Sequence, residues 1–268
     1  MPDIHPSAIV HSSAQLADNV SVGPFSIIGP DVQLGNDCKV DAYVQIKGNV
    51  TAGRGNSFYH GACIGEAPQD ISFDNPTARI EIGDNNVIRE NVTIHLPSKP
   101  GNTTKVGNNN YLMVGSHLGH DVQMGNNIFL VNCAAIAGYV EISDNAYISG
   151  LVGVHQFVKI GRFALISGVS MVTKDVPPFT VSAGSPAKVH GLNLVGLKRA
   201  KMSTSVIRVI KNLYKTLYFT GEPPKKIVEK MQTKLLAQYT LNSEEYNVVK
   251  EMIDFINTSN RGILSRDS

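Results

Sequence analysis

A six-residue repeat runs through most of the first two thirds of the chain and constrains its fold more than any other feature. Its first position is almost always Ile, Leu or Val, glycine recurs at the second, and the fifth is usually small or apolar. From Leu112 the hexads read LMVGSH, LGHDVQ, MGNNIF, LVNCAA and IAGYVE. A period of six fits neither an amphipathic helix nor a simple alternating strand. It is typical of a β-helix, in which each hexad forms one short strand and successive coils stack.

The hexads have a physical logic within such a coil. The aliphatic first position points inward, the small fifth position fits a crowded corner, and Gly and Asn suit the turns. If three hexads make one turn, residues eighteen apart stack at the strand spacing of roughly 4.8 Å. The repeat is interrupted at about 67–78 and 96–105, where Pro, Gly, Asn and Asp are frequent. We expect two loops there, and loops on a rigid scaffold often carry binding residues.

The pattern changes after about residue 186. Ser203 precedes apolar residues at helical spacing, Pro223 and Pro224 open a second such segment, and Ser243 precedes a third. Serine is a favoured N-cap, and proline is tolerated in the first helical turn. The sequence therefore predicts an all-β parallel β-helix over residues 1–189, with two loop insertions, followed by a C-terminal helical domain over residues 190–268.

Composition excludes several classes of protein. There is no run of eighteen apolar residues, so we expect no membrane span. The formal net charge of +2 gives no general case for nucleic-acid binding. No basic segment followed by an apolar one opens the chain, so we expect no secretory signal. The three cysteines show no CxxC spacing, which predicts free thiols in a reducing, cytoplasmic setting.

A histidine cluster is the clearest candidate site. The segment SHLGHD holds His117 and His120, with Asp121 directly after the second. Stacking at eighteen residues places Gly138 beside His120 and Gln156 beside Gly138, so a polar cluster spans three coils. From these residues alone, the histidines are metal ligands, a catalytic base with its orienting acid, or polar side chains on the surface with no chemical role.

Several motifs extend over nearly the whole chain and carry a family resemblance. With its hexads and the segments SHLGHD, GLVGVHQF, KDVPPF, GLNLVGLKRA and NRGIL, the chain resembles the UDP-N-acetylglucosamine acyltransferases of lipid A biosynthesis. The resemblance implies a left-handed coil and a homotrimer with active sites between subunits. It implies transfer of an (R)-3-hydroxyacyl group from acyl carrier protein to the sugar 3-hydroxyl, with neither cofactor nor metal.

The resemblance also implies roles for individual residues. His120 is the general base, which suits a side chain with an unperturbed pKa of about 6.5. Asp121 orients that base, and the N–H of Gly138 stabilises the oxyanion. Gly168 limits the length of the acyl chain. The implied substrate-binding residues are Gln69, Asp70, His117, Tyr139, His155, Gln156, Asn193 and Arg199.

Three residues depart from the family pattern. Ser72 stands where many members have lysine, Tyr139 where histidine is common, and Val195 where glutamate is common. All three belong to the acceptor side of the implied site. The choice between a 3-hydroxyl and a 3-amino sugar therefore stays open.

Two alternative functions are also compatible with the sequence. The chain could be a metal enzyme similar to the γ-class carbonic anhydrases, with histidine ligands to zinc. It could also be another hexapeptide acyltransferase, using acetyl-CoA or succinyl-CoA or acting later in lipid A synthesis on the sugar nitrogen.

Between Val176 and Gly221 the chain has no acidic residue, and this basic stretch fits an acidic carrier protein. Its basic residues include Lys188, Lys198, Arg199, Lys201, Arg208, Lys211 and Lys215.

Overall fold

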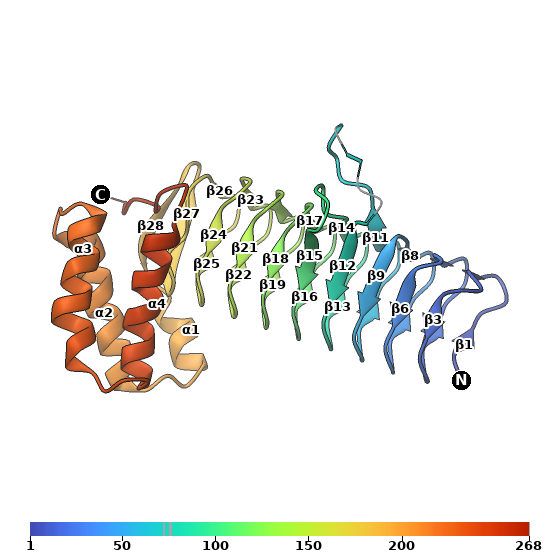
Figure 1. Ribbon diagram of the computed structural model, residues 1–268, viewed down its shortest axis with the longest axis horizontal. Helices are drawn as coiled ribbons and strands as arrows, with labels where there is room; N and C mark the ends of the chain where they lie inside the picture. Colours follow the sequence, from blue (N-terminus) through green and yellow to red (C-terminus); the bar gives the residue numbers. More distant parts are fainter. Residues whose placement is uncertain (72, 75–76, 268) are drawn as a thin grey trace.

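The computed structural model describes residues 1–71, 73–74 and 77–267. The chain forms a long three-sided coil of short strands, and helices pack at its C-terminal end (Figure 1). The predicted left-handed parallel β-helix with a helical C-terminal part is confirmed. The N-terminus lies at the free end of the coil and the C-terminus beside the helices, at opposite ends of the molecule (Figure 1).

Each side of the coil is one sheet of stacked strands in the part of the chain that the structure describes. Sheet A contains, in spatial order, β1 (Asp3–Ile4), β4 (Ser21–Val22), β7 (Lys39–Val40), β10 (Ser57–Phe58), β13 (Val87–Ile88), β16 (Tyr111–Leu112), β19 (Phe129–Leu130), β22 (Tyr147–Ile148), β25 (Leu165–Ile166), β27 (Thr180–Gly184) and β28 (Ala187–Leu192). Sheet B contains β2 (Ile9–Val10), β5 (Ile27–Ile28), β8 (Gln45–Ile46), β11 (Cys63–Glu66), β14 (Thr93–His95), β17 (His117–Leu118), β20 (Ala135–Ile136), β23 (Gly153–Val154) and β26 (Met171–Val172). Sheet C contains β3 (Gln15–Leu16), β6 (Val32–Leu34), β9 (Asn49–Ala52), β12 (Arg79–Ile82), β15 (Thr103–Val106), β18 (Gln123–Met124), β21 (Glu141–Ile142) and β24 (Lys159–Ile160).

The strand register confirms the expected stacking interval. Ser21 pairs with Lys39, and Tyr111 pairs with Phe129, eighteen residues later in each case. The interval rises to thirty residues between Ser57 and Val87 and to twenty-four between Val87 and Tyr111. The chain therefore inserts twelve and six residues between stacked strands without breaking the sheet. The first insertion follows β11, where its described residues project from the prism (Figure 1).

Aliphatic side chains from the first position of each hexad fill the coil. On sheet B, Ile46, Ile64 and Ile94 lie one above another and have 0% exposure. Leu118 and Ile136 continue the column. Removing one such side chain from water is worth about 1.5–3 kcal/mol. This face of the core is therefore a continuous stack of aliphatic layers.

Buried asparagines interrupt the apolar columns at one corner, where the repeat predicts a small or apolar residue. Asn56, Asn86 and Asn110 occupy successive fifth positions and are almost completely buried. The Asn86 amide donates to Asn56 Oδ1 (3.0 Å) and to the carbonyl oxygen of Gly107 (2.9 Å), and its own Oδ1 accepts from the N–H of Asn110 (2.9 Å). Buried polar groups need such partners. The ladder thus satisfies turn carbonyls that face the interior.

The C-terminal helices form a second apolar core against the end of the coil (Figure 1). They are α1 (Leu194–Arg199), α2 (Thr204–Phe219), α3 (Pro224–Lys230), the π-helix Met231–Leu235, the 3₁₀-helix Leu236–Gln238 and α4 (Glu244–Thr258). As predicted, Ser203 caps α2 and Ser243 caps α4, each accepting a backbone N–H through its hydroxyl. Within the described ranges, no helix combines the length and apolarity needed to cross a membrane.

The asparagine ladder leads to a stability prediction. Asn86→Ala leaves the Gly107 carbonyl and the Asn110 N–H buried without their partner, so we expect a loss of roughly 2–3 kcal/mol in the free energy of unfolding. The measurement is urea or thermal unfolding. The matched control is Asn85→Gly, because Asn85 is exposed with φ of 56°, a region that glycine adopts freely. Equal losses in the two variants would contradict a stabilising role for the ladder.

Candidate active site

His120 and Asp121 form a close pair at the corner between sheets B and C. Asp121 has φ of 61°, in the left-handed region that Asn and Asp tolerate. Its carboxylate turns back to the preceding residue, with Asp121 Oδ2 2.7 Å from His120 Nδ1. The Asp121 side chain is only 2% exposed and that of His120 12% exposed. The corner therefore buries the acid and leaves the histidine ring at the surface of a pocket.

The second loop holds the Asp121 carboxylate in place. Ser98 donates to Oδ2 through both its N–H (2.9 Å) and its hydroxyl (2.8 Å), and Asn102 Nδ2 donates to Oδ1 (2.7 Å). Burial alone would raise the pKa of Asp121, but the hydrogen bonds from Ser98, His120 and Asn102 outweigh it and lower that pKa. Asp121 is therefore ionised and can only accept hydrogen bonds. The proton of neutral His120 must then sit on Nδ1, which leaves the Nε2 lone pair free.

Gly138 lies directly over the His120 ring, as the stacking interval predicts. A side chain at position 138 would overlap the ring, so the imidazole occupies the space that glycine leaves open. The Tyr139 N–H donates to the carbonyl oxygen of His120 (3.0 Å) and ties the two corners together. Within the described residues, the N–H of Gly138 donates to no protein acceptor. It is available to a ligand beside His120 Nε2.

His117 has a different environment from His120. Its Nδ1 lies 2.7 Å from the Thr93 hydroxyl, and its ring meets that of His95 edge to face at 4.8 Å. Burial, with smaller contributions from His95 and His120, lowers the pKa of His117 to about 4. Burial also lowers the pKa of His95. His117 is therefore neutral at neutral pH, and it can exchange hydrogen bonds with a hydroxyl or an amide but offers no positive charge.

These histidines line a pocket of about 390 Å³ on sheet B. Its lining combines polar side chains with small or flexible apolar residues. Along the sheet, His117, Ala135, Gly153 and Met171 stand in one column of paired strands. The predicted site residues at this pocket are Gln69, His117, His120, Gly138, His155 and Gln156. A polar ligand at His120 can therefore continue into an apolar trough over Ala135 and Gly153.

The comparisons with known proteins agree over nearly the full length of the chain. The curated acyl-[acyl-carrier-protein]–UDP-N-acetylglucosamine O-acyltransferase of a Psychrobacter species is 44% identical over 98% of this chain and 100% of its own length. The corresponding protein of Syntrophobacter fumaroxidans is 40% identical over 97% and 99%. The chain belongs to this family. The UDP-N-acetylglucosamine acyltransferase structure from Francisella novicida has a TM-score of 0.91 and 38% identity, covering 98% of this chain and 94% of that one. Residues 175–264 match the family model described as Udp N-acetylglucosamine O-acyltransferase, Domain 2.

Other predicted site residues of this acyltransferase-family chain lie outside the pocket lining. Asp70 is half-buried next to Gln69, and Gly168 is exposed at the corner between sheets A and B. Asn193 is buried as the N-cap of α1, where its amide donates to the carbonyl oxygen of Phe163 (2.9 Å). Arg199 and Val195 are exposed on α1. Ser72 lies outside the described residues.

Three residues at the site were not predicted from the sequence. His95 lines the pocket, while Ser98 and Asn102 hold Asp121 from behind. The sequence held one indication of these residues, the interruption of the repeat at 96–105, where we expected a loop of the kind that often carries binding residues. Because the insertion changes the stacking interval there from eighteen to twenty-four residues, counting along the hexads could not place His95 beside His117.

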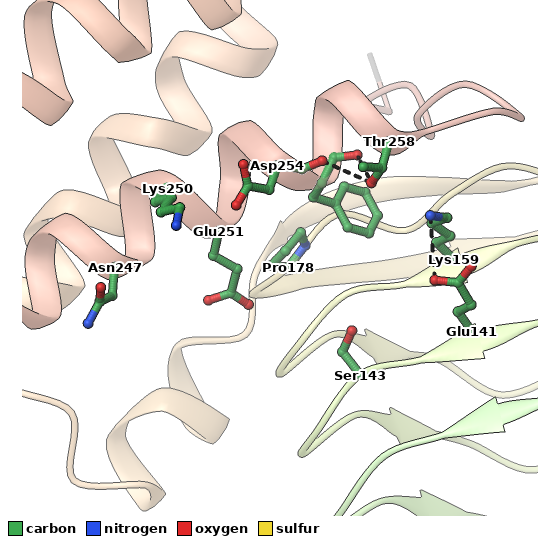
Figure 2. A pocket seen from close by; sticks show the side chains of 10 residues that line it. Glu141, Ser143, Lys159, Pro178, Asn247, Lys250, Glu251, Asp254 and Thr258 are labelled. Carbon is green, nitrogen blue, oxygen red and sulfur yellow. Dashed lines mark hydrogen bonds and ion pairs between the residues drawn. The ribbon is translucent and has the colours of Figure 1, made fainter. Parts of the chain in front are cut away.

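A separate cleft of about 420 Å³ lies between the coil and α4. Figure 2 shows Glu251 and Asp254 of α4 on one side and the ion pair of Lys159 with Glu141 on the other. Glu251 also forms a two-pronged ion pair with Arg162, which ties α4 to the coil. The histidine pair does not line this cleft. Lys159, Glu141 and Glu251 have partners within the protein, and we assign the cleft to packing between the two parts of the chain.

The contact of Gly138 with His120 gives a prediction for this site. In Gly138→Ala, the added methyl group must displace the imidazole, so we expect kcat to fall by roughly 10²-fold with the fold preserved. Turnover and thermal unfolding are measured on the same preparation. Gly191→Ala is the control, because a methyl group there meets no atom within 4 Å. Full turnover by Gly138→Ala would show that the ring does not need this space.

Proposed function

We propose that this protein transfers an (R)-3-hydroxyacyl group from acyl carrier protein to the 3-position of UDP-N-acetylglucosamine, or of its 3-amino analogue. This is the first step of lipid A biosynthesis. The supporting observation is the geometry of His120 in a chain of this family. Asp121 accepts a hydrogen bond from the Nδ1–H of neutral His120, and Nε2 is left free at a pocket lined by both polar and apolar residues.

The proposed chemistry is a direct acyl transfer. His120 Nε2 takes the proton of the sugar hydroxyl as that oxygen attacks the thioester carbonyl carbon. The Gly138 N–H stabilises the resulting oxyanion, a contribution that typically reaches about 3 kcal/mol. The carbon–sulfur bond then breaks, and the thiolate leaves with the proton carried by His120. The products are the acylated sugar nucleotide and the free thiol of the carrier, and no covalent enzyme intermediate is needed.

The acceptor sugar nucleotide is assigned to the polar residues that line the pocket. Gln69, His117, His155 and Gln156 are among them, and Asp70 adjoins Gln69. A neutral His117 suits the hydroxyl and amide groups of the sugar, because Nδ1 contacts Thr93 and Nε2 is left to donate or accept according to the tautomer. By family resemblance Tyr139 would belong to the same acceptor side, but it lines a neighbouring pocket with Asp121 rather than this one.

We assign Asn193 and Arg199 to the pocket of a neighbouring subunit and not to the pocket of their own chain. Both lie in the C-terminal part, outside the pocket lining of their own chain. In the homotrimer that we propose, a neighbouring subunit brings them to the pocket. Asn193 retains acceptor capacity on Oδ1 beyond the bond from the Gly196 N–H (2.9 Å). The exposed guanidinium of Arg199 can pair with phosphate.

Acyl carrier protein is the proposed donor partner. Arg208, Lys211 and Lys215 are exposed on α2, where their spacing places them near one face of the helix. An acidic carrier would be steered to such a face before its acyl chain enters the apolar trough. The three free cysteines fit action in a reducing cytoplasm.

The decisive test of the proposed function is a mass-spectrometric assay of wild type and His120→Ala, with hydroxyacyl carrier protein and both sugar acceptors. We expect acylated sugar nucleotide from wild type and a fall in kcat of roughly 10²-fold or more in the variant, because the general base is removed. The variant must unfold at the wild-type temperature. Near-normal turnover by His120→Ala would rule out its assignment as the base.

Gly168 is the residue that we propose determines which acyl-chain lengths the enzyme accepts. Its φ does not lie in the region that requires glycine, and a Cβ would meet the Gly150 carbonyl oxygen at 3.3 Å. We therefore propose that glycine is present to leave the groove open to a long chain. Gly168→Met should shift preference to shorter donors, because each buried methylene contributes about 0.8 kcal/mol. The readout is kcat/KM across a donor series, with Gly168→Ala as the graded control. Equal loss on long and short donors would contradict the proposal.

A further inference from the structure

The hydroxyl of Tyr139 is connected to the His120–Asp121 pair through one intervening residue. Tyr139 Oη lies 2.8 Å from Ser98 Oγ, which in turn lies 2.8 Å from Asp121 Oδ2. That same carboxylate oxygen is 2.7 Å from His120 Nδ1. Four side chains, from two corners of the coil and one loop, are thus joined in a single hydrogen-bonded row.

The direction of each hydrogen bond in this row follows from the charge of Asp121. An ionised carboxylate only accepts, so Ser98 Oγ must give it its single proton. Ser98 Oγ is then left with lone pairs alone toward Tyr139. Tyr139 must therefore be the donor in their contact. Its one proton is committed to the protein and is not available to a substrate.

The ring of Tyr139 is also fixed, and on the far side of the catalytic histidine. It stacks on Phe157 at 4.7 Å with an angle of 10° between the planes, and it meets the His120 ring edge to face at 5.1 Å. Tyr139 and Asp121 line a neighbouring pocket of about 440 Å³, whereas the pocket at His120 Nε2 is lined by other residues. Tyr139 therefore lies behind the base, on the side of its carboxylate partner.

We propose that Tyr139 is a positioning residue that acts through Ser98 on the Asp121 carboxylate, and so on the proton affinity and orientation of His120. This inference rests on the proposed function, in which His120 is the general base. A hydroxyl that accepts one hydrogen bond becomes a better donor in the next, by roughly 10–30% in the condensed phase. The Tyr139 hydroxyl thus makes the carboxylate a weaker base and holds it in one orientation.

Several other ionisable groups surround this row. Lys99 Nζ lies 5.8 Å from the centre of the Tyr139 ring, on the same loop as Ser98. His117 and His95 approach His120 from strands β17 and β14, and both contribute to the local electrostatics. The pocket that Tyr139 and Asp121 line also includes Lys105, Glu141 and Lys159. The substitutions of the test leave all of these residues in place. A difference in pH profile between a variant and the wild type can then be attributed to the hydroxyl that the variant lacks in the hydrogen-bonded row.

The test uses Tyr139→Phe, Ser98→Ala, the double variant and Ser98→Thr. Tyr139→Phe keeps the stacked ring and removes only the hydroxyl. We expect kcat to fall roughly 3- to 10-fold with the KM for the sugar nucleotide unchanged, as for a group that acts on the base rather than on binding. Because Asp121 becomes more basic, the acidic limb of the kcat/KM profile should move to higher pH by roughly 0.3 unit.

The double variant separates action through Ser98 from a direct effect. If Tyr139 acts through Ser98, adding Tyr139→Phe to Ser98→Ala should change nothing further, and the cycle should be strongly non-additive. Ser98→Thr retains the hydroxyl and should restore the wild-type pH profile. Tyr147→Phe is the matched control, because Tyr147 stacks on Phe129 in another aromatic column far from the histidines.

A substrate-free measurement keeps this inference separate from the proposed function. In protein with ¹³C-labelled histidine, the His120 signal is assigned by its loss in His120→Ala, and its titration midpoint should rise in Tyr139→Phe whether or not the sugar is turned over. Additive effects in the cycle would overturn the inference. So would a raised KM with an unmoved pH profile and titration, because Tyr139 would then contact the substrate.

Discussion

The parallel pairing of each strand with the strand one coil later is the constraint on which the rest of the structure depends. It fixes every residue of one coil relative to its counterpart in the next, at roughly 4.8 Å along the axis. Gly138 lies over His120 only because of this pairing, and the imidazole has room only because that counterpart has no side chain. A scaffold of stacked aliphatic layers thus sets the position of the proposed catalytic ring.

The two insertions use the same pairing in a different way. The second adds six residues between stacked strands and keeps Thr93 paired with His117. Because both ends of the insertion are held by sheet hydrogen bonds, the loop between them returns to a defined place beside the coil. Ser98 and Asn102 reach the Asp121 carboxylate from that loop. The rigid repeat supplies His120 and Asp121, the proposed base and its acid, and the irregular loop supplies the groups that hold the acid.

This division explains how far sequence reasoning could reach. The coil, the helix caps at Ser203 and Ser243, and the stacking of His120 with Gly138 follow from local periodicity and were predicted. His95, Ser98 and the buried asparagines were not. Their partners are set by the length of an insertion or by carbonyl groups that turn inward at a corner, and neither leaves a periodic signal. The assigned roles of Asn193 and Arg199 depend on a neighbouring subunit, so pairing within one chain could not place them at the pocket.

The environments of His117 and His120 explain why two histidines three residues apart can have different roles. His117 is buried against Thr93 and His95, and its pKa of about 4 makes it a weak base at neutral pH. A general base works best when its pKa is near the operating pH. His120 instead has an ionised carboxylate at Nδ1, which stabilises the imidazolium that forms when Nε2 takes a proton. The difference comes from Asp121, since the turn at its positive φ brings its carboxylate to His120. One acidic residue in a corner thus distinguishes the proposed proton acceptor from a neutral hydrogen-bonding partner on the same strand and turn.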